Sequence, residues 1–131
     1  TDITGGWWQN TEYRWSSAVQ RPNTGTVSFN GNSIYCSPTD DTSAFASTKN
    51  KIKLSGFSTL KAILTVVNRY DLLLTPQSSG YLDGNTHKYE ILSSENQEYS
   101  LDIGGLQEAY VVIGTHGGST RKTTIHKVWL E

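Results

Sequence analysis

Residues 52–68 read IKLSGFSTLKAILTVVN, and residues 101–115 read LDIGGLQEAYVVIGT. Both stretches follow one plan: a short β-type run, a turn that contains glycine, and a longer apolar run. If the two stretches are built alike, their longer strands run in the same direction. The segments that follow these strands, 68–71 and 115–121, then leave the fold at the same end.

The rest of the chain is a series of short β-rich runs separated by turn residues, and no helical periodicity is sustained. Joints rich in glycine, asparagine, aspartate and serine separate the runs at 30–32, 68–71, 78–85, 93–97 and 116–120. The predicted strands are 11–16, 25–30, 33–37, 43–54, 59–68, 71–75, 87–92, 98–103, 108–115 and 123–130. Short strands with hairpin-length joints predict an all-β fold, an antiparallel sandwich of two sheets packed face to face.

Alternation along each strand assigns side chains to the two faces. The strand at 59–68 has an inner row and further apolar residues opposite, which predicts a central position in its sheet. The expected inner residues are Val27, Phe29, Ile34, Cys36, Leu60, Ala62, Leu64, Val66, Val128 and Leu130, and the expected outward ones are Ser28, Tyr35, Ile63, Val67 and Trp129.

Composition limits the classes of partner. The chain has 131 residues, which predicts a single domain over 1–131, and a formal net charge of -1. Neither nucleic acid nor an anionic membrane is expected as a partner, because both need a concentrated basic surface. The lone Cys36 excludes an internal disulfide and favours a buried, inert thiol. The chain lacks methionine and a signal-peptide pattern, so we expect a piece excised from a longer protein.

Catalysis is not expected. The carboxylates are scattered over turns and separate strands, and the three histidines lack metal-ligand spacing or a partner serine motif. His126, in the last predicted strand, is expected to be an ordinary half-exposed residue. The stretch SPTDDTS at 37–43 could supply oxygen ligands for a structural calcium ion, but a solvated turn is the stronger interpretation. We therefore predict no cofactor, with calcium as the alternative.

Aromatic and hydrogen-bonding residues gather in the predicted joints. Sugar rings stack on indole and phenol rings, while their hydroxyls need polar partners on rigid loops. The candidate ligand-binding residues in these joints are Arg69, Tyr70 and Asp71 in NRYD, Tyr81 in GYLDGNTH, and His116 and Arg121 in THGGSTR. For each one a structural role, such as pinning a hairpin or covering the core, is an equal alternative.

The opening stretch TDITGGWWQNTEYRW carries three of the four tryptophans. Tyr13 and Trp15 alternate as in a strand, which favours the core for one of them. Trp7 and Trp8 are adjacent, so in an extended chain they point to opposite sides. We expect one of these two to be buried and the other to join the ligand-binding surface or contact a neighbouring domain.

Three longer stretches resemble a known family: KNKIKLSGFSTLKAILTV (49–66), EYSLDIGGLQEAYVVIGT (98–115) and TTIHKVWLE (123–131). They are similar to a β-sandwich module of tail and adhesion proteins of phages that infect Gram-positive bacteria. The shared pattern falls on Lys51 to Lys61, Tyr99 to Gly114 and Ile125 to Glu131, within about residues 50–131. The resemblance implies a jelly-roll, galactose-binding-like sandwich of the carbohydrate-binding-module type. It also implies an extracellular or virion location and host cell-wall polysaccharide as the partner.

The sequence thus predicts a non-catalytic saccharide-binding module of a phage tail adhesion device, flanked by other domains of its parent protein. The alternative is a structural spacer or assembly domain whose exposed tryptophans pack against a neighbour.

Overall fold

The computed structural model of the chain describes residues 1–10, 22–67, 72–77, 88–89, 94–116 and 118–131. These residues form β-strands, turns and loops, and within them no helix is long and apolar enough to cross a membrane. The strands are β1 (Trp7–Trp8), β2 (Thr26–Asn30), β3 (Ser33–Ser37), β4 (Ser43–Thr48), β5 (Ile52–Lys53), β6 (Thr59–Val67), β7 (Leu72–Gln77), β8 (Lys88–Tyr89), β9 (Ser94–Asp102), β10 (Glu108–His116) and β11 (Lys122–Leu130).

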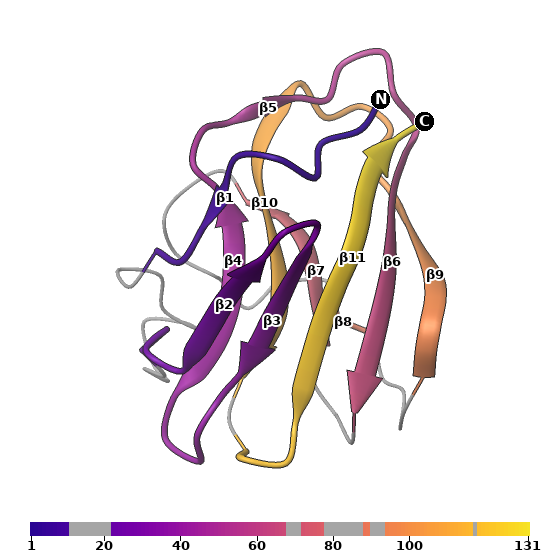
Figure 1. The fold of residues 1–131 in the computed structure, drawn as a ribbon. Coiled ribbons are helices and arrows are strands. Elements are labelled where there is room, and N and C mark those ends of the chain that lie inside the picture. Colours follow the sequence, from indigo (N-terminus) through magenta and orange to yellow (C-terminus); the bar gives the residue numbers. More distant parts are fainter. Residues whose placement is uncertain (11–21, 68–71, 78–87, 90–93, 117) are drawn as a thin grey trace.

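The strands form two antiparallel sheets that pack face to face (Figure 1). The five-stranded sheet has the order β2-β3-β11-β6-β9. The six-stranded sheet has the order β1-β4-β10-β7-β8, with β5 also paired to β10. This confirms the predicted all-β, two-sheet antiparallel sandwich. The strand predicted as central, β6, is an interior strand between β11 and the edge strand β9. The jelly-roll order of connections stays a prediction.

The two similar stretches form matching turns. In both turns, 54–57 and 103–106, the N–H of the fourth residue donates to the C=O of the first over 3.1 Å. The third positions are Gly56 and Gly105, whose φ angles are 90° and 88°. A type II turn needs a positive φ at this position, and glycine adopts it without steric cost. The repeat seen in the sequence is therefore a repeat in the structure.

The two similar stretches, 52–68 and 101–115, pair with each other. The N–H of Leu54 donates to the C=O of Gln107 over 2.8 Å, and the N–H of Ile103 donates to the C=O of Ser58 over 3.0 Å. The short β5 pairs with the long β10, and β9 pairs with the long β6. Each stretch thus pairs its first strand with the longer strand of the other stretch.

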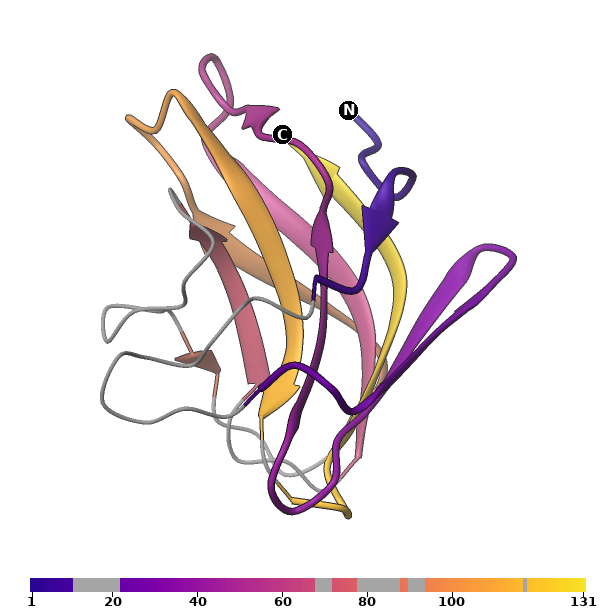
Figure 2. The ribbon, with the colours of Figure 1, turned by 90° about the vertical axis from the view of Figure 1, so that its left-hand side faces the viewer.

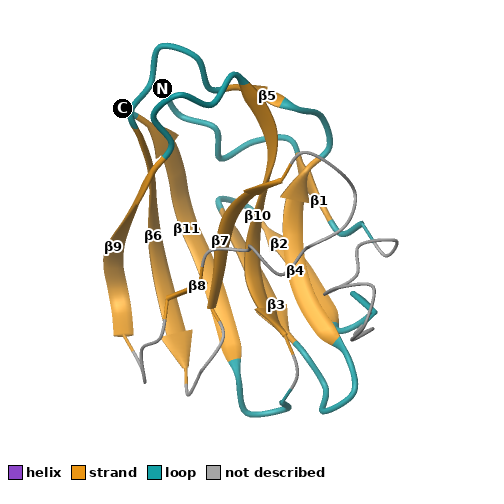
Figure 3. Ribbon diagram, turned by 180° about the vertical axis from the view of Figure 1, so that it is seen from behind, coloured by secondary structure: helices purple, strands orange, loops and turns teal. Residues whose placement is uncertain are grey.

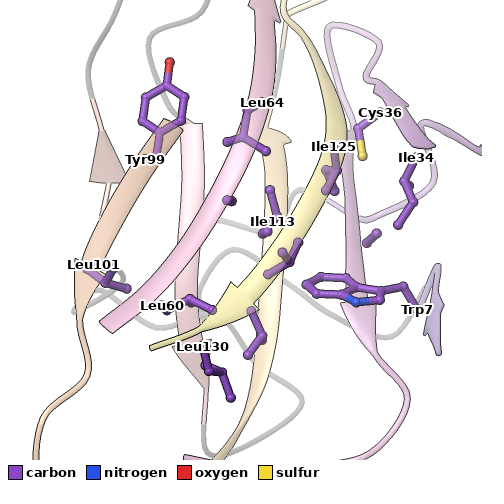
Figure 4. Close-up of a cluster of buried hydrophobic side chains, with 14 of the residues drawn as sticks. Trp7, Ile34, Cys36, Leu60, Leu64, Tyr99, Leu101, Ile113, Ile125 and Leu130 are labelled. Atoms are coloured by element: carbon purple, nitrogen blue, oxygen red, sulfur yellow. The ribbon is translucent and has the colours of Figure 1, made fainter. Parts of the chain in front are cut away.

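Side-chain alternation places the core between the sheets, as predicted. The inner row of β6 is fully buried, and Tyr35 and Trp129 turn to the opposite faces of their strands. His126 is half-buried. Figure 4 shows core side chains contributed by both sheets: Trp7, Ile34, Cys36, Leu60, Leu64, Tyr99, Leu101, Ile113, Ile125 and Leu130.

Phe29 differs from its neighbours in the predicted inner row. It lies opposite Ile34 in the β2–β3 pairing, so the two share the inner face, yet Phe29 is 48% exposed. Figure 2 shows the reason: the β2–β3 hairpin projects past the edge of the other sheet, so nothing described lies opposite its tip.

β4 lies between β1 and β10 in the six-stranded sheet (Figure 3), and all six of its residues are buried, so this part of the sheet is covered on both faces. Ala44 and Ala46 face the core between the sheets. Phe45 and Ser47 point the other way and are also fully buried, as is Val112 of the adjacent β10. The five-stranded sheet, by contrast, presents half-buried and exposed side chains on its outer face.

Two predicted strand limits are wrong. The run 43–54 is not continuous: β4 ends at Thr48 and β5 begins at Ile52, and the pairing with β10 is interrupted at 48–51. Beside this break the Thr48 hydroxyl accepts the N–H of Val111 over 3.1 Å. Residues 94–97, predicted as a joint, belong to β9, and their turn-type residue Asn96 (φ 49°) lies at a bulge against β6. The predicted strand at 11–16 lies outside the described residues.

Candidate functional site

The strand register defines one end of the sandwich, which we call the loop end: the described segments 38–42 and 118–121 and the strand ends next to them. Val67, the last residue of β6, pairs with Lys122, the first residue of β11. Ser43, the first residue of β4, pairs with His116, the last residue of β10. The chain leaves β6 and β10 here, so these two strands run in the same direction, and the prediction made from the repeat is confirmed.

Two described segments of the loop end are tied together. The N–H of Gly118 donates to the C=O of Thr39 over 3.1 Å, and the N–H of Ser119 donates to Asp40 Oδ1 over 2.9 Å. Hydrogen bonds from the Ser119 backbone and side chain lower the pKa of the Asp40 carboxyl below its usual value. The Thr39 and Thr42 hydroxyls lie 2.8 Å apart and close the turn of the first segment.

Arg121 lies over the turn that precedes it. The backbone N–H of Arg121 donates to the backbone C=O of Gly118 over 3.1 Å, and the Arg121 side chain is half-buried. A Cβ atom at position 118 would lie 3.0 Å from Arg121 Nε and 3.1 Å from its Cδ. Gly118 also has a φ of 93°, which favours glycine. Glycine at this position therefore lets the Arg121 side chain lie against the turn.

Several predicted site residues fall outside the part that the structure describes. Arg69, Tyr70, Asp71 and Tyr81 lie in the segments 68–71 and 78–87. His116 is placed by its backbone as the last residue of β10, and its side chain is likewise outside the description. The loop end thus holds His116 and Arg121, together with the strand end from which NRYD follows.

The chain on either side of segment 78–87 is described. Gln77 precedes it and pairs with Tyr110, away from the loop end, whereas Lys88 follows it and pairs with Leu73, next to the start of β7. The described strands therefore bring the strand end that precedes NRYD and the segment 118–121 to one end, and they give no such placement for Tyr81.

The tryptophan pair divides as predicted. Trp7 is 7% exposed, and its indole N–H donates to the C=O of Ile3 over 2.6 Å. Trp8 is 39% exposed, with Lys49 Nζ 5.8 Å from the centre of its ring. Trp7 belongs to the core, so of the two only Trp8 is available for stacking on a ligand.

Trp8 does not join the loop-end residues. It pairs with Ser47, whereas the loop end of the same strand is at Ser43. Four residues of extended chain separate the two positions by about 13 Å. Because β1 pairs with the far half of β4, Trp8 lies apart from the loop end, and its role in ligand binding stays a prediction.

The residue at the loop end that the sequence interpretation missed is Asp40. The DD pair was expected to be a solvated turn or a calcium ligand, but Asp40 fixes the 118–121 segment through Ser119. No sequence signal joins two positions so far apart in the chain. Among the described residues, no group of three or more histidine, cysteine, aspartate or glutamate side chains could hold a metal ion.

The described loop end is suited to hydrogen bonding. Its side chains are the hydroxyls of Thr39, Thr42, Ser119 and Thr120, the carboxyls of Asp40 and Asp41 and the guanidinium of Arg121. Comparison with models of protein families gives no match, and comparison with curated proteins finds no significant similarity.

Proposed function

We propose that this chain is a non-catalytic saccharide-binding module and that the loop end is its binding site. The observation that supports this most directly is the strand register. It brings the strand end that leads into NRYD to the same end of the sandwich as the 118–121 segment with Arg121. The proposal also draws on the sequence of NRYD, which supplies Tyr70 for stacking and Arg69 and Asp71 for hydroxyl groups.

The described part of the site contributes polar groups in fixed positions. Its two segments are joined by hydrogen bonds of 3.1 and 2.9 Å, so little ordering is needed when a ligand binds. A guanidinium offers several N–H donors in one plane, and it can bond two neighbouring ring hydroxyls. A shallow site of this kind binds weakly, and repeated copies on one particle would raise the avidity.

The resemblance to phage adhesion modules suggests the natural ligand and the location of the module. The ligand would then be a polysaccharide of the host cell wall, and the module would act in a phage tail, outside the cell. Neighbouring domains of the parent protein would be its other partners.

The test is calorimetric titration with purified wall polysaccharides from several Gram-positive species. The Arg121→Ala variant should bind about tenfold or more weakly, because a hydrogen bond to a charged group contributes about 1.5–3 kcal/mol. Lys53→Ala is the matched control, since Lys53 is an exposed cation of β5 outside the loop end. Equal losses in both variants would argue against a site at the loop end.

A second candidate is a structural spacer or assembly domain. The observation that favours it is the exposure of large apolar side chains away from the loop end, Trp8 at 39% and Phe29 at 48%. If no glycan of a broad panel changes the heat signal or the tryptophan fluorescence, the spacer is the better account.

A further inference from the structure

β2 is an open edge of the five-stranded sheet. All five of its residues pair with β3, and among the described residues no strand lies along its other side. β3 in turn pairs with β11 only at 123–125. Residues 1–3 bond to β11 nearer its end, so the β2–β3 hairpin turns away from the sandwich (Figure 2).

The turn fixes which backbone groups of β2 are free for pairing. Asn30 and Ser33 flank the two-residue turn 31–32, in which Gly31 has a φ of 62°. Residues that flank such a turn exchange hydrogen bonds with each other, and every second residue repeats this. The N–H and C=O groups of Val27 and Phe29 therefore point away from β3, towards the open edge.

The other edges of the described sheets are protected against pairing. β1 and β8 are two residues long. β9 carries Glu95, Glu98 and Asp102 and is interrupted by the bulge at Asn96. Short edge strands, charges and bulges are the usual devices that prevent edge-to-edge association. β2, with the sequence TVSFN, has no charge, no proline and no shift in its register with β3.

Apolar side chains lie beside this open edge. Val27 and Phe29 share one face of β2, with Val27 partly buried against the core and Phe29 48% exposed. Thr26, Ser28 and Asn30 occupy the other face. A second strand along β2 would cover Phe29 and satisfy the outward backbone groups at the same time.

We propose that two copies of this chain associate through β2, antiparallel, about a two-fold axis that passes beside Ser28. In this register Val27 of each copy lies opposite Phe29 of the other, and the two residues exchange backbone hydrogen bonds. Ser28 lies opposite Ser28 of the second copy, and Thr26 lies opposite Asn30.

A second copy of the chain is the partner that fits β2 best, because β2 is complementary to itself in this register. In the two-fold register apolar side chains meet apolar ones on one face, and short polar ones meet on the other. No charge of β2 is brought against its equivalent, and the paired sheets continue without a gap. The contact is small, so the association is reversible and weak.

Disulfide trapping tests the register. In the Ser28→Cys variant the two new thiols lie in a non-hydrogen-bonded pair with Cα atoms about 4.5 Å apart, which is within disulfide reach. Mild oxidation should give a covalent dimer in high yield. Asn30→Cys is the control: its thiol lies opposite Thr26, and it should give at least tenfold less dimer. The native Cys36 is fully buried and does not interfere.

Sedimentation of the reduced chain tests the association itself. From about 10 μM to about 1 mM the unmodified chain should pass reversibly from monomer towards dimer, as expected of a weak contact. Phe29→Lys should raise the dissociation constant at least tenfold, and Gln97→Lys, the same charge on the edge strand β9, should leave it unchanged. A chain that stays monomeric at the highest concentration would overturn the proposal. So would equal trapping at positions 28 and 30, or a dimer that Phe29→Lys leaves intact.

Discussion

Replacing Asn23 by leucine should cost about 4 kcal/mol of stability. The Asn23 side chain is fully buried beside β4, at the edge where β1 has ended. Its Oδ1 accepts the N–H of Phe45 over 2.8 Å, and its Nδ2 donates to the C=O of Phe45 over 2.8 Å and to that of Asn10 over 3.0 Å. The carboxamide thus takes the place of a strand residue. Leucine would leave both Phe45 backbone groups without these partners, at about 1–3 kcal/mol each.

A loss of this size is a large part of the free energy of unfolding, which is usually about 5–15 kcal/mol for a domain. Urea denaturation followed by tryptophan fluorescence measures it directly. The midpoint should fall while the slope m stays constant, since the change acts on the folded state. Asn32→Leu, in the exposed β2–β3 turn, should change stability by less than about 0.5 kcal/mol.

Asn23→Asp separates hydrogen bonding from packing. The carboxylate keeps the acceptor for the Phe45 N–H but faces two carbonyl oxygens, so burial and repulsion raise its folded-state pKa above the unfolded value. Stability is then greatest below the unfolded pKa of about 3.9 and is lost as the pH rises through the folded-state pKa. If Asn23→Leu costs less than about 1 kcal/mol, or Asn23→Asp shows no such pH dependence, the strand-like role of Asn23 is refuted.

Three further predictions concern single residues of the framework. Gly114→Ala should lower stability by about 3 kcal/mol or prevent folding, because its Cβ would clash with the Phe45 backbone and the Ala44 C=O; Gly5→Ala, with open space around it, should be neutral in the same thermal melts. Gly56→Ala and Gly105→Ala should each cost about 1–2 kcal/mol in urea denaturation, because both force a side chain into a positive φ; clearly unequal costs would contradict the equivalence of the two turns. Burial raises the pKa of the Cys36 thiol to about 12, so a thiol reagent at pH 8 should modify it only as fast as the chain unfolds; rapid modification of the folded chain would show that the site is open.

Two local features of the sequence, side-chain alternation and the repeated turn, predicted most of the sheet structure. The inner row of β6 follows from alternation alone, and the equivalence of the turns at 54–57 and 103–106 follows from the repeat. The direction of β6 and β10, and with it the loop end, could be predicted because a repeated turn repeats its geometry.

Long-range pairing explains what the sequence did not predict. Residues 94–97 are polar, yet pairing with β6 makes them strand, because an edge strand can face water. The exposure of Phe29 depends on how far the hairpin projects, and the distance of Trp8 from the loop end depends on the half of β4 to which β1 pairs. The contact between Asp40 and Ser119 joins segments that no local pattern relates.

Saccharide binding at the loop end can be followed residue by residue through backbone amide NMR shifts during titration with wall polysaccharide. Shifts should concentrate on residues 39–42 and 118–121, while residues 54–57 and 103–106, in the two repeated turns, should stay unchanged. Shifts that gather elsewhere, or no shifts with any glycan tested, would refute saccharide binding at the loop end.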